Sequence, residues 1–181
     1  HQIAQNMSHL TYMIVLGIGA ATTVRVSHQL GVLDLEAARK AGNASTHLCL
    51  VYNALAGTLL IAFRYTIASA FTSDPAVIEI GGRLLIMAGI FQVSDGLQTI
   101  GAGILRGLTD VKIVMYYAFI AYICINIPFG YLFGFVFHLG AVGVWAAFIF
   151  GLSVAAVLFR LRCRKMFRQL EASGKYAVKT A

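Results

Sequence analysis

The chain has 181 residues, of which 59% are hydrophobic and only 12% are charged. A soluble domain carries roughly 25% charged residues, so this composition leaves too few charges to cover a water-exposed surface. It excludes an ordinary soluble globular protein and predicts a multi-pass membrane protein. The formal net charge is +7, and the positions of the basic residues along the chain decide what this charge means.

Five apolar stretches are each long enough to cross a bilayer as a helix, which takes about 20 residues. They are predicted at about residues 3–29, 47–71, 76–105, 111–137 and 141–160. A loop over 32–45 separates the first two, and Asp74 followed by Pro75 signals the start of the third helix. Pro128, just after Asn126, predicts a kink in the fourth helix because proline lacks a backbone N–H. The predicted fold class is all-α and membrane-embedded.

The beginning of the first stretch is too polar for a helix that faces lipid. Its polar residues are Gln2, Gln5, Asn6, Ser8, His9 and Thr11. We expect this part of the helix to face a cavity or neighbouring helices. Asn6 and His9 are candidate cavity residues, and the alternative for His9 is a hydrogen-bonded packing role.

The basic residues divide unequally between the two sides of the membrane. Successive helices alternate in direction, which places twelve of the fourteen lysines and arginines on one side. These are Arg25, Arg39, Lys40, Arg106, Lys112, Arg160, Arg162, Arg164, Lys165, Arg168, Lys175 and Lys179. Basic residues favour the cytoplasmic side, so we expect a cytoplasmic C-terminus with residues 166–181 as a tail on anionic lipid. Topology accounts for the charge, and nucleic-acid binding is not needed to explain it.

Asp95 is the acidic residue in the middle of a predicted span. It follows Arg83 by twelve residues and precedes Arg106 by eleven, which puts it near the bilayer midplane at about 1.5 Å per residue. An ionised carboxylate is costly there unless it is paired, protonated, ion-bound or open to water. Asp95 is therefore the main functional candidate, and the alternative is an aspartate satisfied by interhelical hydrogen bonds.

A polar stripe accompanies Asp95 along its helix. Gln92, Asp95, Thr99 and Ala102 recur at helical spacing, with Gln98 beside them. The rest of this helix is mainly leucine, isoleucine, phenylalanine and glycine. We therefore expect one polar face around the carboxylate.

A second candidate region surrounds the interruption of the fourth span. Asn126 and Pro128 are interpreted either as a packing kink or as a hinge that exposes backbone carbonyls to a cavity. Tyr122, with Tyr116 and Tyr117, is a candidate for stacking on an organic cation. Core or interfacial aromatic residues are the alternative interpretation.

The three cysteines follow no metal-binding or redox spacing. Cys49, Cys124 and Cys163 form no CxxC motif and no pairing with histidine. Cys49 and Cys124 fall inside apolar runs and are predicted to be buried free thiols. The sequence predicts neither a disulfide nor a cofactor, and no residue is assigned a catalytic role.

Several motifs in order resemble one family of membrane transporters. Residues 91–98 (FQVSDGLQ) and 101–107 (GAGILRG) resemble the tenth helix of multidrug and toxic compound extrusion (MATE) transporters. The opening HQIAQN, the segment Ile127–Tyr131 and the segment Gly140–Trp145 recur in the same order in that family. The resemblance covers about residues 1–165 and is closest to the bacterial NorM-like branch.

This resemblance implies a fold and an activity. Residues 1–165 would be helices eight to twelve, and so most of one six-helix lobe, of a twelve-helix protein in the bacterial inner membrane. The protein would be a secondary antiporter, not an enzyme, that exports organic cations in exchange for sodium or protons. The chain starts at His1 without a methionine, so we expect helix seven and the other lobe upstream as its partners, with lipid around them.

The resemblance also implies a site. The acid at the position of Asp95 belongs to a cation site that it shares with an acid on helix seven. Phe91 stands where the family often has a tyrosine and brings no hydroxyl group. Phe91, Gln92 and Thr99 are assigned to this site with Asp95, and no metal other than sodium is expected.

Two other functions stay open from the sequence. One is a flippase for lipid-linked oligosaccharides from the same superfamily, which would need more basic residues in its cavity than these spans offer. The other is a structural or non-functional membrane fragment, which upstream sequence would distinguish from a transporter.

Overall fold

The computed structural model describes residues 2–138 and 140–174, and these residues form long helices without a strand. The helices are α1 (Gln2–Gly31), α2 (Leu35–Ala62), α3 (Arg64–Phe71), α4 (Pro75–Gly107), α5 (Val111–Phe119), α6 (Ile127–Tyr131) and α7 (Gly140–Ala172). Two π-helical segments, η1 (Ile120–Asn126) and η2 (Leu132–Val136), join α5 and α6 into one rod. Within the described ranges, five helices are long and apolar enough to cross a membrane. The all-α membrane fold predicted from the sequence is confirmed.

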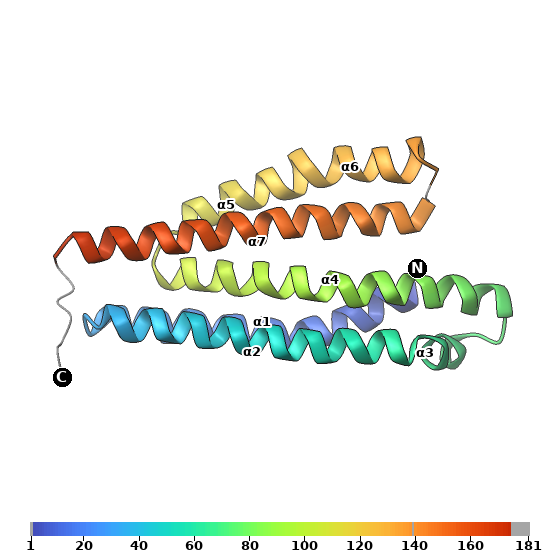
Figure 1. Cartoon of the computed structure of the whole chain (residues 1–181), viewed down its shortest axis with the longest axis horizontal. Helices are drawn as coiled ribbons and strands as arrows, with labels where there is room; N and C mark the ends of the chain where they lie inside the picture. The colour runs from blue at the N-terminus through green and yellow to red at the C-terminus, as the bar shows by residue number, and fades with distance from the viewer. Residues whose placement is uncertain (1, 139, 175–181) are drawn as a thin grey trace.

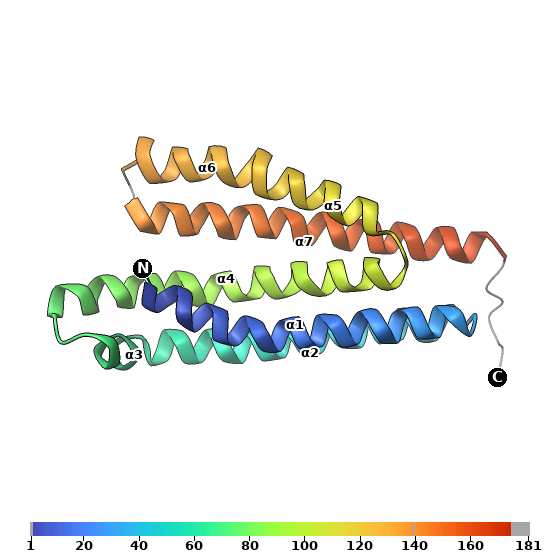
Figure 2. The same cartoon turned by 180° about the vertical axis from the view of Figure 1, so that it is seen from behind.

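The long helices lie along one common axis with α4 in the middle of the bundle, whereas the short α3 is turned across that axis (Figure 1). Helix α4 contacts α1, α2, α3, α5 and α7. The rod from α5 to η2 packs on the outer side of α7. The α1–α2 turn, the α4–α5 turn and the end of α7 lie at one end of the bundle, and α3 lies at the other (Figures 1 and 2).

Glycines on α4 let its neighbours approach closely. Gly82, Gly89, Gly96 and Gly103 recur every seventh residue, which keeps them on nearly one face of the helix. A Cβ atom at Gly103 would lie 2.8 Å from the Gly19 carbonyl oxygen of α1. The Thr23 hydroxyl also donates to the Gly103 carbonyl at 2.9 Å. Small residues of this kind are a common basis of helix packing in membranes.

Two helices extend further than the sequence predicted. The predicted loop over 32–45 is only a turn at 32–34, because the Asp34 carboxylate caps α2 by accepting the Ala37 N–H at 2.8 Å. Helix α7 continues to Ala172 instead of ending near 160, so part of the predicted tail is helical. Residues 175–181 of that tail lie outside the described residues. Hydropathy marks where a helix leaves the apolar layer, whereas backbone hydrogen bonding continues past that point.

The predicted second span is divided near its end. Helix α2 ends at Ala62, and α3 turns away from it after Phe63 (Figure 1). The Arg64 guanidinium donates to the Ile61 carbonyl at 3.1 Å and lies 4.6 Å from the centre of the Tyr65 ring. These contacts hold the arginine at the break.

The predicted start signal of the third span is confirmed. The Asp74 carboxylate accepts the Ala76 N–H at 2.9 Å, and Pro75 is the first residue of α4. Proline suits this position because the first N–H groups of a helix have no intrahelical partner. The cap therefore sets where α4 begins.

The interruption of the fourth span takes a different form from a simple kink. π-Helical turns lie on both sides of the short helix α6, which contains Pro128. Proline removes a donor and crowds the carbonyl four residues earlier, and a wider π-helical turn accommodates such a defect. Asn126 is buried here against Gly151 of α7, with 7% of its surface exposed.

The cysteines are free thiols in two different environments. Cys49 and Cys163 are buried, and Cys124 is exposed. The prediction that Cys124 is buried was therefore wrong. An apolar run on an outer helix can face lipid instead of protein, and hydropathy does not distinguish the two.

Candidate cation-binding cavity

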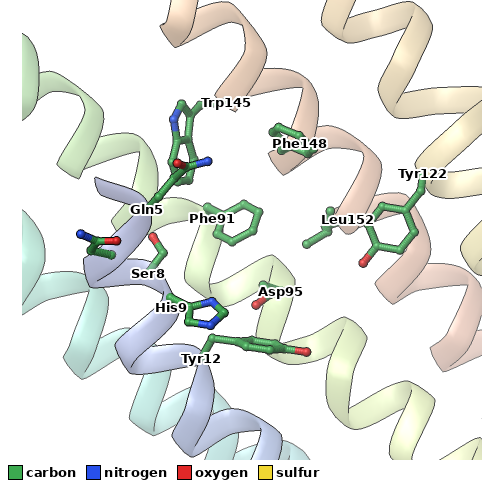
Figure 3. A pocket seen from close by; sticks show the side chains of 11 residues that line it. Gln5, Ser8, His9, Tyr12, Phe91, Asp95, Tyr122, Trp145, Phe148 and Leu152 are labelled. Carbon is green, nitrogen blue, oxygen red and sulfur yellow. The ribbon is translucent and has the colours of Figure 1, made fainter. Parts of the chain in front are cut away.

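A cavity of about 570 Å³ opens between α1, α4, η1 and α7 near the middle of the bundle. We call it the carboxylate cavity because Asp95 lies in its wall. Its lining residues are Gln5, Asn6, Ser8, His9, Tyr12, Phe91, Asp95, Tyr122, Trp145, Phe148 and Leu152. Figure 3 shows the α1 side chains on one side, Phe148, Leu152 and Tyr122 on the other, and Phe91 and Asp95 between them, with Trp145 above.

Asp95 is the acidic residue of this lining. Its side chain is partly buried, and no hydrogen bond or ion pair joins it to another residue in the described part of the chain. A carboxylate without a protein partner inside an apolar bundle favours a proton, a cation or water beside it. The structure therefore leaves Asp95 available to a ligand that enters the cavity.

Aromatic rings surround the carboxylate. Phe91 lies one turn before Asp95 on α4, and its ring meets Trp145 edge to face with 5.3 Å between ring centres. Tyr122 reaches in from η1, and its hydroxyl donates to the Gln98 side-chain carbonyl at 3.2 Å. Aromatic faces attract organic cations through their negative π surface. The walls thus combine one negative charge with several cation-attracting rings.

The polar beginning of α1 forms the opposite wall. Asn6 and His9, both named from the sequence, line the carboxylate cavity together with Gln5, Ser8 and Tyr12. The rings of His9 and Tyr12 have centres 6.4 Å apart. The Ser8 hydroxyl is buried without a hydrogen-bond partner among the described residues. These groups can donate or accept hydrogen bonds beside a bound ligand.

The stripe predicted around Asp95 is divided by the packing of α1. Gln92 is buried, and its amide donates to the Thr11 hydroxyl of α1. Thr99 lies against Gly19 of α1, where an added Cβ would be 3.2 Å from the threonine methyl. Neither residue lines the carboxylate cavity. Both side chains point toward α1, and that helix covers them.

Three further predicted site residues also lie outside the lining. Gln98 is buried and reaches the cavity only through its hydrogen bond with Tyr122. Asn126 packs against Gly151, and Pro128 is exposed on the outer rod. The structure therefore brings Asn6, His9, Phe91, Asp95 and Tyr122 to one cavity and leaves the other five candidates in its surroundings.

Sequence reasoning missed four of the lining residues, Tyr12, Trp145, Phe148 and Leu152. Gln5 and Ser8 belong to the polar helix start that was expected to face a cavity or neighbouring helices. The sequence of α7 did contain a pattern that indicates a shared face, because large side chains at 145, 148 and 152 recur at helical spacing. On α1, Tyr12 follows His9 by three residues and so shares its face.

The described residues hold no cluster of three or more histidine, cysteine, aspartate or glutamate side chains that could bind a metal ion. Asp95 alone cannot form a complete metal site, because a bound cation needs several oxygen ligands. What the cavity offers is one carboxylate, neutral polar groups and aromatic faces.

Fold and cavity together define a class of protein: a multi-pass helical membrane protein with a carboxylate-bearing cavity among its spans. The MatE family model matches residues 1–132. The chain belongs to the MatE family.

Characterised relatives agree with this assignment. The chain is 37% identical over 166 residues to multidrug resistance protein MdtK of Photorhabdus laumondii, covering 90% of this chain and 36% of the relative. It is 39% identical over 173 residues to multidrug resistance protein NorM of Vibrio vulnificus, covering 93% of this chain and 38% of the relative. The chain thus spans less than two fifths of the length of these relatives.

Solved structures show the same fold. The eukaryotic MATE transporter AtDTX14 superposes with a TM-score of 0.83 at 24% identity, over 95% of this chain and 40% of that protein. The outward-facing conformation of a multidrug resistance MATE family transporter superposes with a TM-score of 0.85 at 20% identity, over 94% of this chain and 38% of that protein.

Proposed function

We propose that this chain belongs to a secondary antiporter that exports organic cations in exchange for sodium or protons, with Asp95 as the coupling carboxylate. The observation that carries the proposal is a carboxylate without a partner among the described residues, in an aromatic-lined cavity inside a bundle of apolar helices. The relatives named multidrug resistance proteins support the substrate class. The proposed role is transport and not enzymatic catalysis.

The lining of the carboxylate cavity favours a cationic ligand over an anionic one. It contains the Asp95 carboxylate and no lysine or arginine among the described residues. Its volume of about 570 Å³ lies within the range of about 300–1,000 Å³ that holds drug-sized ligands. A flippase for lipid-linked oligosaccharides would have to neutralise phosphate groups, for which the described lining offers no lysine or arginine.

Competition between the coupling ion and the substrate for one carboxylate explains how ion entry is coupled to substrate export. An empty charged Asp95 is unfavourable in the membrane interior, so the site favours either the coupling ion or the substrate. A ligand that binds one orientation of the carrier better shifts the population toward that orientation. Each elementary charge that moves down about 100 mV supplies about 2.3 kcal/mol for this cycle.

The remaining candidates take supporting roles in the proposal. Phe91, His9, Asn6 and Tyr122 would contact the substrate, and Gln92, Thr99 and Gln98 would position the cavity walls. Asn126 and Pro128 would form a hinge in the rod. A sodium ion at Asp95 would need further oxygen ligands in addition to the carboxylate.

The proposed location is the bacterial inner membrane with a cytoplasmic C-terminus. Ten described lysines and arginines lie toward the bundle end that holds the α1–α2 turn, the α4–α5 turn and the end of α7 (Figure 1). Arg64 and Arg83 lie toward the opposite end. The positive-inside rule assigns the basic end to the cytoplasm.

Asp95→Asn tests the proposal in cells that express the protein as its gene encodes it. The amide keeps the shape of the side chain but removes its charge, so export of a cationic dye should fall by about tenfold or more. The pH or sodium dependence of the remaining export should flatten. Glu79→Gln, on the same helix outside the carboxylate cavity, is the matched control and should export normally.

Protein in the membrane is quantified for each variant, so that loss of activity is separated from loss of insertion. Wild-type export by Asp95→Asn, with its ion dependence intact, would remove Asp95 from the mechanism. Equal loss in the Glu79→Gln control would show a general effect of charge on folding instead.

A further inference from the structure

A second cavity, of about 410 Å³, lies between α2 and α7 at the basic end of the bundle. It is far along the axis from the carboxylate cavity and shares no lining residue with it. Four arginines line it, and we call it the arginine cavity. They are Arg39 on α2 and Arg160, Arg164 and Arg168 on α7.

The charges in the arginine cavity are not balanced within the described chain. Glu171 is the acidic residue of its lining, and it already pairs with Arg39 at 2.9 Å. Arg160 donates to the neutral side-chain oxygen of Asn43 at 3.3 Å. No carboxylate in the described ranges forms an ion pair with Arg160, Arg164 or Arg168.

This imbalance is local to one face of α7. Arg162, on the adjacent face, forms an ion pair with Asp110 of the α4–α5 turn at 2.6 Å. Arg160, Arg164 and Arg168 are four residues apart, so like charges stack along one side of the helix, which is unfavourable without a counter-ion. An anion in the cavity would remove this repulsion.

The floor of the arginine cavity is apolar and closely packed. Ile104, Cys163 and Phe167 are at most 7% exposed. Gly42 lies against Ile104, where a Cβ would be 3.2 Å from the isoleucine side chain. The guanidinium of Arg39 lies 5.6 Å from the centre of the Phe167 ring. The cavity is thus a recess with an apolar base, at whose rim Arg164 and Arg168 are exposed and Arg39 and Arg160 are partly buried.

The chemistry of the lining selects phosphate. Guanidinium groups donate paired, planar hydrogen bonds that match phosphate oxygens, which makes arginine the preferred residue for such groups. Three guanidinium groups without a carboxylate partner in the described chain suit a ligand that carries at least one phosphate charge.

An apolar surface adjoins the arginines in the direction of the membrane interior. Val157 and Leu161 share a helical face with Arg164 and Arg168, following the spacing i, i+4, i+7 and i+11. Their side chains are 58% and 56% exposed. A ligand with its phosphate on the arginines could lay hydrocarbon along these residues, which a free phosphate ion cannot do.

We propose that the arginine cavity is a binding site for the headgroup of an anionic phospholipid, whose acyl chain lies along Val157 and Leu161. Basic recesses between helices at a membrane surface bind such headgroups in other membrane proteins. The site stands apart from the proposed transport function, because it uses neither Asp95 nor the carboxylate cavity. A bound lipid would tie α2 to α7 at this end of the bundle.

The test is lipid binding by the purified chain, counted by native mass spectrometry in detergent. Wild-type protein should bind phosphatidylglycerol at a concentration about tenfold lower than phosphatidylcholine. The double variant Arg160→Gln/Arg164→Gln should lose this preference. The matched control Lys112→Gln/Lys165→Gln removes the same charge from exposed positions outside the cavity and should keep it.

Two further measurements separate lipid binding from loss of fold and from binding of free phosphate. Arg160→Lys/Arg164→Lys retains the charge and should keep most of the preference, which separates charge from fold if the glutamine variant is unstable. Inorganic phosphate at millimolar concentration should not displace phosphatidylglycerol. Equal losses in both glutamine doubles, equal binding of the two lipids, or displacement by inorganic phosphate alone would each overturn the lipid assignment.

Discussion

Buried polar side chains that have no partner are the most informative single residues of this chain. Asn126 is 7% exposed, and neither its side-chain oxygen nor its nitrogen has a hydrogen-bond partner in the part of the chain described. Leaving a buried amide unpaired costs about 1–3 kcal/mol. Gly151 of α7 sits directly against this amide, with room for no Cβ atom. The close approach therefore holds a polar group of η1 against the backbone of α7.

We expect the effects of Gly151→Ala and Asn126→Ala on stability to be coupled. In the wild-type background, Gly151→Ala should destabilise the chain by about 1–3 kcal/mol, since the added methyl overlaps the amide. In the Asn126→Ala background the same change should cost much less. Unfolding of the purified variants in detergent, read as a double-mutant cycle, measures the coupling.

Gly130→Ala provides the control for this cycle. A Cβ at Gly130 of α6 would lie 4.0 Å from Ala147, an ordinary contact between the same rod and α7. It should be tolerated in both backgrounds. An unchanged cost of Gly151→Ala when Asn126 is absent would show that the amide does not define this contact.

At the scale of elements, α4 organises the bundle through its small residues. Its glycines contact α3, α2 and α1 in turn, at Tyr65, Gly57 and Gly19. Gly96 occupies the tightest of these positions, because a Cβ there would lie 2.8 Å from the Cys49 sulfur and nearer still to the Asn53 amide. The same helix carries Asp95, so the packing that places α1 and α2 also shapes the carboxylate cavity.

Gly96→Ala should therefore lower the stability of the bundle. Asn53 is 1% exposed and cannot move aside freely, and such overpacking costs about 1–3 kcal/mol. Gly17→Ala is the matched control, since a Cβ at Gly17 meets nothing within 4 Å. Alanine favours the helix, so this control should be neutral or stabilising by up to about 1 kcal/mol.

Thermal unfolding of both variants in the same detergent, followed by circular dichroism, distinguishes the two outcomes. A melting temperature of Gly96→Ala equal to that of Gly17→Ala would mean that α2 and α4 can separate without cost at this point.

At the scale of the whole molecule, the charge asymmetry links sequence to orientation. The basic end carries the ion pair between Arg39 and Glu171, the ion pair between Arg162 and Asp110, and the arginine cavity. The other end carries only Arg64 and Arg83 among the described lysines and arginines, and Arg83 pairs with Glu79 at 2.7 Å. If the basic end is retained in the cytoplasm, the direction of all five spans follows from it, because successive helices alternate in direction.

Epitope tags in the turns test this orientation. We expect tags after Ser73 and His138 to react with antibody in spheroplasts, from which the outer membrane has been removed, because they lie at the end with few basic residues. Tags after Leu33 and Thr109 should react only after permeabilisation. All four sites lie between helices, so insertion there leaves the spans intact.

If all four tags give the opposite accessibility, the orientation of the chain in the membrane is the reverse of the one proposed. If only the tag after Ser73 needs permeabilisation, the count of five spans is contradicted.

The carboxylate at the centre of the site and the five spans could both be predicted from the sequence. Hydrophobicity adds up along a segment, so length and composition are enough to recognise a span. An acid within such a span stands out for the same reason, and Asp95 needed no structural information. The motifs that resemble MATE transporters identified the family, which the MatE match confirms.

Helix ends and breaks were less accessible to prediction. The start of α2 depends on a cap at Asp34, and its end on a bend at Phe63. Both are local backbone events inside stretches whose composition barely changes. Hydropathy averages over such events, which explains the errors at 32–45 and at the predicted end near 160.

The lining of each cavity was decided only by tertiary structure. Gln92 and Asp95 are three residues apart, yet α1 covers the first and leaves the second open to the carboxylate cavity. Trp145 enters that cavity from α7, and Arg39 of α2 meets the arginines of α7 in the other. A sequence specifies which residues share a helical face, but the rotation of each helix and the neighbour it packs against determine whether that face is buried, lipid-exposed or open to a ligand.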